Sequence, residues 1–133
     1  MPTPTQIVRE FVDTFVAAWP TGDAARVASL FSIDASYHNG PLEPVRGRSA
    51  IEATLAEFMA MGGEVTVDML NLLADERLVM TERVDHFVIG GSTYSLPVMG
   101  IFEVERDGRI AAWRDYFDLG QFSSQLGGRG HRA

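Results

Sequence analysis

Three segments in the first half of the chain carry apolar residues at helical spacing. In the first segment, apolar side chains recur at steps of three and four residues: Ile7, Val8, Phe11, Phe15 and Ala18. This spacing predicts a helix over residues 5–19. A second, short helix is expected over residues 24–31, after Asp23, which can cap it. A third helix opens at Gly47 and runs to about Met61.

After the second helix the hydrophobic pattern changes to a period of two residues, which is typical of β-strands. The first such stretch is short and covers residues 32–39. The third helix then leads into four longer stretches of strand-like sequence. We place these strands over residues 64–73, 77–89, 92–106 and 109–118. A last helical turn over residues 119–126 completes the predicted elements.

Helices followed by a run of antiparallel strands predict an α+β fold. We expect a curved, mixed or antiparallel sheet folded over three N-terminal helices, which together form a cone with an apolar pocket. One face of the strand over residues 64–73 would carry Val65, Val67, Met69 and Asn71. Gly100 lies within a later strand, where a glycine indicates a bulge or a bend.

Length and composition narrow the class of protein. The 133 residues suit a single domain, which we assign to residues 1–126, and the glycine-rich residues 127–133 predict a flexible tail. A net charge of −7 without a basic run argues against a nucleic-acid or anionic-membrane partner. The absence of cysteine excludes disulfides and thiol nucleophiles. With no visible signal peptide or spanning segment, we expect a cytoplasmic protein.

Candidate chemistry comes from polar residues that are two positions apart on predicted strands and therefore share a face. Three short segments have this form: Tyr37 with Asn39, Arg83 with Asp85, and Asp115 with Trp113 and Phe117. If the three faces meet, one pocket holds two carboxylates, a guanidinium, a phenol and an amide. Taken alone, each segment has a structural interpretation: a surface ion pair, a core tyrosine or a turn aspartate.

Four motifs in this order resemble the limonene-1,2-epoxide hydrolase family. They are Tyr-His-Asn at 37–39, Gly-Arg-Ser-Ala-Ile-Glu-Ala-Thr-Leu-Ala at 47–56, Thr-Glu-Arg-Val-Asp at 81–85 and Trp-Arg-Asp-Tyr-Phe-Asp at 113–118. That family belongs to the cone-shaped superfold shared with nuclear transport factor 2, ketosteroid isomerase and SnoaL-like polyketide cyclases. The resemblance covers roughly residues 31–122.

The resemblance implies a hydrolase that adds water to an epoxide and releases a vicinal diol. It implies Asp115 as the general base and Asp85 as the general acid, with Arg83 between them. Tyr37 and Asn39 would hold the attacking water together with Asp115. Water is a poor nucleophile and an alkoxide is a poor leaving group, so one carboxylate must be ionised and the other protonated. Burial and a neighbouring negative charge favour the protonated form of a carboxyl group.

The same resemblance implies an apolar substrate pocket. We expect its walls to include Leu55, Phe58, Met59, Phe87, Leu96, Val98, Phe117 and Phe122, although the pattern does not separate pocket wall from core. The reaction needs no metal, no cofactor and no covalent ester. A small apolar epoxide and water are the expected partners, and a homodimer through the open sheet face is expected.

Some residues have a simpler interpretation, and two other functions remain open. Trp113 is expected to serve in packing, and His38 and His86 fall on the faces opposite the site. An isomerase or cyclase of the same fold would also use an aspartate base. A non-catalytic ligand-binding module is the third possibility, but three charges buried in an apolar cone would be costly there.

Overall fold

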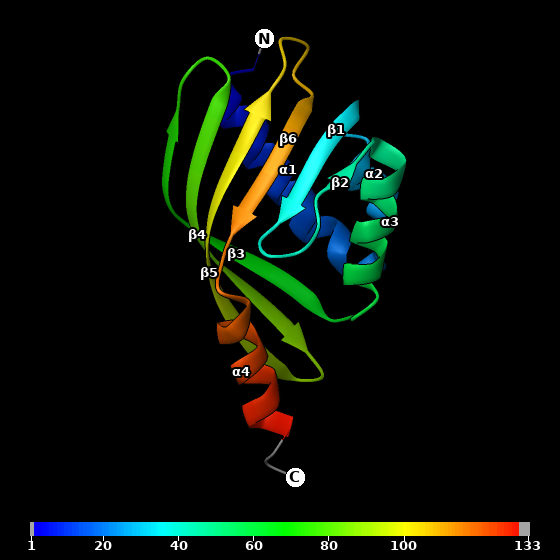
Figure 1. The fold of residues 1–133 in the computed structure, drawn as a ribbon, viewed down its shortest axis with the longest axis vertical. Coiled ribbons are helices and arrows are strands. Elements are labelled where there is room, and N and C mark those ends of the chain that lie inside the picture. The colour runs from blue at the N-terminus through cyan, green and yellow to red at the C-terminus, as the bar shows by residue number, and fades with distance from the viewer. Residues whose placement is uncertain (1, 131–133) are drawn as a thin grey trace.

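The computed structural model of the chain describes residues 2–130 (Figure 1). The helices in this range are α1 (Pro4–Ala18), the short 3-10 helix η1 (Trp19–Thr21), α2 (Ala24–Ala28), α3 (Arg48–Met59) and α4 (Leu119–Gly130). The strands are β1 (Phe31–Asn39), β2 (Val45–Arg46), β3 (Glu64–Ala74), β4 (Leu78–Ile89), β5 (Ser92–Val104) and β6 (Ile110–Tyr116). No helix in the described part of the chain is long and apolar enough to cross a membrane.

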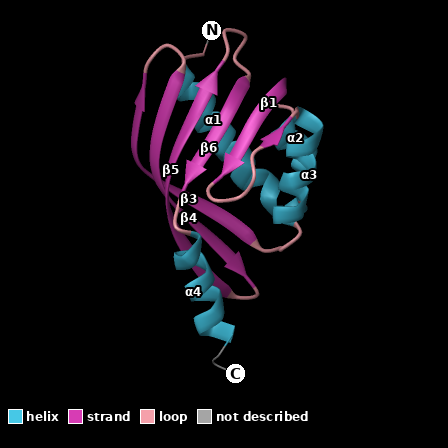
Figure 2. Cartoon of the chain, viewed as in Figure 1, coloured by secondary structure: helices cyan, strands magenta, loops and turns pink. Residues whose placement is uncertain are grey.

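The six strands form one sheet in the order β2-β1-β6-β5-β4-β3. All neighbouring pairs are antiparallel except β1 and β6, which run parallel. Figure 2 shows α1 crossing behind the sheet, α2 and α3 beside β1 and β2, and α4 at the lower end of the long curved strands. This arrangement confirms the predicted α+β fold with a curved, mixed sheet.

The first helix packs its apolar stripe against the inner face of the sheet. Thr3 caps it, because its hydroxyl accepts a hydrogen bond from the Gln6 amide while the Gln6 side chain accepts one from the Thr3 amide. The Phe11 ring lies edge-on to three rings, with centroid distances of 5.4 Å to Phe31, 5.5 Å to Phe102 and 5.1 Å to Trp113. These contacts join the helix to β1, β5 and β6.

Two boundaries near β1 differ from the prediction. The second helix ends at Ala28, and Phe31 is the first residue of β1, where it pairs with Ile110 of β6. Apolar spacing alone does not distinguish a buried strand start from a last helical turn. The short strand β2 was not predicted. It follows Pro44 and pairs with β1 at the edge of the sheet, a position that a preceding proline permits.

A bulge in β3 reverses part of the predicted face. The register with β4 shifts between Met69 and Asn71, so that Asn71 lies opposite Glu82 and donates a hydrogen bond to its carboxylate at 2.7 Å. Asn71 is therefore on the outer face, and the prediction that it shares a face with Val65 is wrong. Leu72 is half-buried and packs against the core instead.

The C-terminal helix is longer than the single predicted turn, because it continues to Gly130. The predicted tail is therefore helical over residues 127–130, and residues 131–133 lie outside the described residues. Gln125 attaches this helix to β5: its side-chain amide donates to the Ser95 carbonyl at 2.8 Å and accepts from the Ser95 amide at 2.9 Å.

Candidate active site

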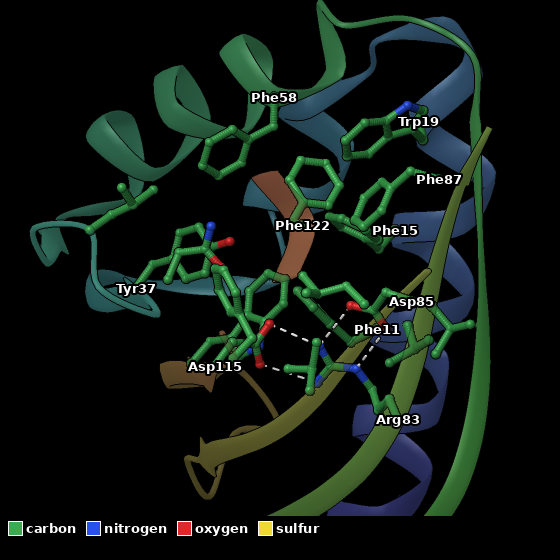
Figure 3. A pocket seen from close by; sticks show the side chains of 18 of the residues that line it. Phe11, Phe15, Trp19, Tyr37, Phe58, Arg83, Asp85, Phe87, Asp115 and Phe122 are labelled. Carbon is green, nitrogen blue, oxygen red and sulfur yellow. Dashed lines mark hydrogen bonds and ion pairs between the residues drawn. The ribbon is translucent and has the colours of Figure 1, made fainter. Parts of the chain in front are cut away.

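A cavity of about 220 Å³ lies between the inner face of the sheet and the helices. Figure 3 shows Phe58, Phe87 and Phe122 around its upper part, and Tyr37, Arg83, Asp85 and Asp115 together at its lower part. Of the predicted wall residues, six line the cavity: Phe58, Phe87, Leu96, Val98, Phe117 and Phe122.

Leu55 and Met59 do not line this cavity. Both are buried in the hydrophobic core, with exposed fractions of 0% and 4%. They lie on the same apolar face of α3 as Phe58, and spacing along a helix does not tell which of these side chains reaches the cavity. Other aromatic and aliphatic walls come from α1, η1 and the loop after β1, including Phe15, Trp19 and Leu42.

Strand register brings the polar residues together. Asn39 of β1 lies opposite Asp115 of β6, Asp115 lies opposite Gly100 of β5, and Gly100 lies opposite Thr81 of β4. These four residues form one row across four strands. Arg83 is two positions along β4 from Thr81, so its side chain leaves the same face of the sheet.

Arg83 bridges the two aspartates. Its Nε and Nη2 donate to the two oxygens of Asp85 at 3.1 and 3.0 Å. Its Nη1 and Nη2 donate to the two oxygens of Asp115 at 3.1 and 2.8 Å. All three side chains are buried, with exposed fractions of 3% for Arg83, 9% for Asp85 and 5% for Asp115. One guanidinium thus makes a paired contact with each carboxylate, the geometry for which arginine is best suited.

Thr81 completes the hydrogen bonding of this guanidinium. Its hydroxyl accepts from Nη1 of Arg83 at 3.1 Å and donates to the Gly100 carbonyl at 3.2 Å. A guanidinium carries five N–H groups, and here each has an acceptor. Thr81 was not among the predicted site residues. In the sequence, Thr81 could have been found from its position two residues before Arg83 and four before Asp85, which places all three side chains on one face of the strand.

Trp113 has a second role besides packing. Its ring stacks on Tyr37 with a centroid distance of 4.5 Å and on Phe102 at 5.4 Å, as the packing prediction requires. Its indole N–H also donates to Oδ1 of Asp115 at 2.7 Å, a contact that the sequence did not indicate. Oδ1 therefore accepts two hydrogen bonds, from Trp113 and Arg83, whereas Oδ2 accepts one.

Of the bulge or bend predicted at Gly100, the bulge is absent. Gly100 lies in regular register with Thr81 and Asp115, and the irregularity in β5 falls between Glu103 and Val104. The glycine is needed for space at this point. A Cβ atom on Gly100 would lie 2.4 Å from Nη1 of Arg83 and 2.5 Å from Oδ1 of Asp115.

Tyr37 and Asn39 both line the cavity, and neither side chain has a hydrogen-bond partner within the described part of the chain. Burial and the negative charge of Asp115 raise the pKa of the Tyr37 hydroxyl well above its usual value, so it remains a neutral hydrogen-bonding group. A phenol and an amide are thus available beside Asp115 for a molecule in the cavity.

Burial governs the charge state of the trio. Removal from water raises the pKa of Asp115 above that of an exposed aspartate, and the adjacent Arg83 opposes this rise without cancelling it. For Arg83, burial disfavours the charged form, but the two carboxylates more than compensate and its pKa is raised. Asp115 can therefore take up a proton more readily than a surface aspartate, while Arg83 stays charged.

His38 and His86 lie away from the cavity, as predicted, and His131 lies outside the described residues. The two ring nitrogens of His86 contact Ser95 Oγ at 2.7 Å and Asp68 Oδ2 at 2.8 Å on the outer face of the sheet. His38 lies beside the ring of Tyr116. Among the residues that the structure describes, no group of three potential ligands could hold a metal ion.

Known proteins share both the sequence and the fold. The pattern of the limonene-1,2-epoxide hydrolase catalytic domain matches residues 2–127. Epoxide hydrolase EphG of Mycobacterium tuberculosis is 35% identical over 109 residues, which cover 81% of this chain and 71% of EphG. A solved epoxide hydrolase from M. tuberculosis, described as LEH-like, matches with a TM-score of 0.71 and 32% identity over 92% of this chain and 90% of its own.

A further solved structure shares the fold. It is a Catenulispora acidiphila protein with a ketosteroid isomerase-like fold, in complex with trimethylamine, which matches with a TM-score of 0.75 and 25% identity over 89% of this chain and 92% of its own. Together these matches confirm the cone-shaped fold and the family that the four motifs indicate. The chain belongs to the limonene-1,2-epoxide hydrolase family, and it is an epoxide hydrolase of this type.

Proposed function

We propose that this protein hydrolyses a small apolar epoxide to a vicinal diol in one step of general acid–base catalysis. Asp115 acts as the base, Asp85 as the acid, and Arg83 holds both. The observation that carries the proposal is the pair of buried carboxylates bridged by Arg83 beside an apolar cavity. Paired carboxylates in different protonation states supply the base and the acid that this reaction needs.

The proposed step conserves atoms and charge. Oδ2 of Asp115, which accepts only one protein hydrogen bond, takes a proton from water. The water oxygen forms a bond to one epoxide carbon while the bond from that carbon to the epoxide oxygen breaks. Asp85 gives its proton to that oxygen. Asp115 then holds the proton and Asp85 is ionised, so the starting state returns when Asp115 releases a proton and Asp85 takes one up. Arg83 keeps its charge throughout and holds both carboxylates through Nη2.

Tyr37 and Asn39 are proposed to orient the attacking water. Both side chains reach the cavity, and Asn39 lies opposite Asp115 in the sheet. Because the Tyr37 hydroxyl stays protonated, it can donate or accept one hydrogen bond but does not compete as a base. Fixing the water in this way would keep its lone pair directed at the reacting carbon.

The cavity supports a small apolar substrate. Its volume of about 220 Å³ exceeds the roughly 150 Å³ of a protein cavity that holds benzene. Apart from the polar cluster, its walls are aromatic and aliphatic, with Phe58, Phe87 and Phe122 at its upper part (Figure 3). Such walls favour an epoxide whose remaining groups are hydrocarbon and leave the epoxide oxygen to find the acid.

The chemical test is hydrolysis of a panel of cyclic and linear epoxides in oxygen-18 water, followed by mass spectrometry. With enzyme in excess, direct attack puts the heavy oxygen into the diol of the first turnover. An ester route through a carboxylate nucleophile would instead give an unlabelled first diol and a labelled carboxylate in the protein. Label in a peptide that contains Asp85 or Asp115 would refute the one-step mechanism.

The two roles are tested by Asp85→Asn and Asp115→Asn. Neither amide can exchange the required proton, so we expect each variant to lose several orders of magnitude in turnover while it stays folded. Near-normal diol formation with an unchanged circular dichroism spectrum would refute the assignment. An isomerase of the same fold needs an aspartate base but no arginine between two carboxylates, and it would produce no diol from any epoxide.

We also propose a homodimer through the outer face of the sheet. The large side chains exposed there in the single chain include Met80, Met99 and Tyr116, at 46%, 52% and 50%. Met99 and Tyr116 are direct cross-strand neighbours, so they form a continuous patch. Sedimentation equilibrium should give twice the chain mass, and Met99→Glu should shift the equilibrium towards the monomer. A monomeric wild type at high concentration would refute this proposal.

A further inference from the structure

The two carboxylates accept four of the five N–H groups of the Arg83 guanidinium. Its Nη1 carries two hydrogens, and only one of them reaches Asp115. The other is donated to the Thr81 hydroxyl at 3.1 Å. Thr81 has an exposed fraction of 0%, so no solvent competes for that hydroxyl.

The direction of the Thr81 hydroxyl is itself fixed. It donates its hydrogen to the Gly100 carbonyl at 3.2 Å, which leaves a lone pair for Nη1 of Arg83. A hydroxyl that only needed to be satisfied could do so with the carbonyl alone. The additional contact to Arg83 makes Thr81 the one neutral acceptor of the guanidinium among the described residues.

Gly100 supplies the space in which this contact forms. It lies between Thr81 and Asp115 in the row across β4, β5 and β6. A Cβ atom here would lie 2.4 Å from Nη1 of Arg83, 2.5 Å from Oδ1 of Asp115 and 3.0 Å from Oγ1 of Thr81. It would therefore meet Nη1 and both of the groups that accept hydrogen bonds from it.

The backbone does not require this glycine. The φ angle of Gly100 is outside the positive range that favours glycine, unlike those of Gly40 and Gly90. A glycine in the interior of a strand lowers stability, because it offers no side chain to pack and loses more conformational freedom on folding. A residue without a side chain is therefore needed at this position because the Arg83 guanidinium occupies the space that a side chain would fill.

We propose that Thr81 and Gly100 together form a seat for Arg83, and that they are positioning residues for the reaction. Gly100 leaves room for Nη1 to lie close to the sheet, and Thr81 fixes its second hydrogen. The guanidinium plane is thereby held where its two edges meet Asp85 and Asp115 at once. The catalytic part of this inference rests on the proposed one-step hydrolysis, whereas the structural part concerns Arg83 alone.

The test compares Thr81→Val with Thr81→Ser in the full chain. Valine keeps the shape of threonine but removes the acceptor, whereas serine keeps the hydroxyl. We expect Thr81→Val to lower kcat for an epoxide at least tenfold with KM changed less than twofold, and to move the acidic limb of the pH–rate profile. Thr81→Ser should stay within about threefold of wild type. Equal kcat values and pH profiles for the two variants would overturn the proposal.

Gly100→Ala provides a second variant that keeps every hydrogen-bonding group. Its methyl group must displace Nη1 of Arg83 or the Asp115 carboxylate, so kcat should fall at least tenfold although no catalytic group is removed. A folded Gly100→Ala protein with wild-type kcat would overturn the role of this glycine. If Thr81→Val does not fold, this variant and Thr81→Ser carry the test.

A readout without substrate separates this inference from the proposed function. Nitrogen-15 NMR of the arginine side chains should show slowly exchanging Nη protons of Arg83 in the wild type and in Thr81→Ser. We expect faster exchange in Thr81→Val and in Gly100→Ala. If no epoxide is hydrolysed but the NMR difference is seen, the proposed function fails and the seat stands. Identical exchange in wild type and Thr81→Val would refute the seat even in an active hydrolase.

Discussion

Replacing Trp113 by phenylalanine should shift the pH dependence of hydrolysis without removing any catalytic group. The indole N–H donates to Oδ1 of Asp115 at 2.7 Å, and this bond favours the ionised carboxylate. A hydrogen bond to a charged group contributes roughly 1.5–3 kcal/mol. Loss of this bond should therefore raise the pKa of Asp115.

The direction of the shift follows from the role of Asp115. The base must be ionised, so activity falls on the acidic side as the carboxylate becomes protonated. A higher pKa moves this acidic limb of the profile of kcat against pH towards higher pH. Well above the limb, kcat should remain within a few fold of wild type. A phenylalanine ring preserves the stacking on Tyr37 and Phe102 in part, so the protein should still fold.

Trp19→Phe is the matched control. Trp19 is as deeply buried, with an exposed fraction of 2% against 5% for Trp113, and its indole N–H donates to the Gly62 carbonyl at 3.0 Å. Each substitution removes one hydrogen bond and replaces the two fused rings of an indole by a single phenyl ring, so both should lower the melting temperature. Only Trp113→Phe should move the acidic limb. An unmoved limb in Trp113→Phe, or equal shifts in the two variants, would refute the link between this indole and the base.

Three further predictions concern the water site, the buried charge and the pocket. Tyr37→Phe and Asn39→Ala should each raise the activation barrier by about 3 kcal/mol, which lowers kcat roughly a hundredfold, while the protein still folds. Unaffected rates would show that the water is held elsewhere. The raised pKa of Asp115 means that the folded state holds its proton more tightly than the unfolded state, so stability from this group is lost as pH rises through the raised value. The free energy of unfolding of Asp115→Asn, measured in urea, should therefore increase relative to that of wild type as the pH rises. A difference between the two proteins that does not change with pH would contradict this. Phe122→Ala should raise kcat/KM for bulky epoxides relative to small ones, because the ring lines the cavity and its removal enlarges the space; an unchanged ratio would remove Phe122 from substrate selection.

Period-two alternation was sufficient to group the polar residues by face. Arg83 and Asp85 lie on the inner face together, as do Tyr37 and Asn39, because a strand fixes the side of each residue locally. The family motifs then indicated that these faces meet. Both conclusions depend on short segments of sequence, where the physics of a single strand or a short motif decides the outcome.

Register between strands was not accessible in the same way. The row that joins Asn39, Asp115, Gly100 and Thr81 depends on the parallel pairing of β1 with β6 and on where each hairpin turns. These contacts link segments far apart in the chain, so the sequence indicated a bulge or a bend at Gly100 and gave Thr81 no place in the site. A one-residue bulge in β3 likewise reversed the face of Asn71.

Pocket wall and core were also inseparable in the sequence. Leu55, Phe58 and Met59 all belong to one apolar stripe on α3, and the arrangement of the surrounding elements decides which of them borders the cavity. The burial of a stripe is a property of the helix, whereas the position of a void depends on every element around it. The extent of α4 was missed for a related reason, since glycine-rich sequence has low helix propensity and this helix packs against β5.

The attachment of Gln125 to Ser95 also limits how the protein can associate. Strand β6 pairs with β5 only from Met99 onwards, so residues 92–98 of β5 extend beyond the end of β6. Unpaired backbone on a strand edge is a template on which another chain can add a strand. At Ser95 the amide and carbonyl are both occupied by one glutamine side chain, which imitates the pair of bonds that a neighbouring strand would make. Helix α4, which contributes Phe122 to the cavity wall, therefore also blocks strand addition at this point. Gln125→Ala should increase aggregation during storage and loosen this part of the pocket.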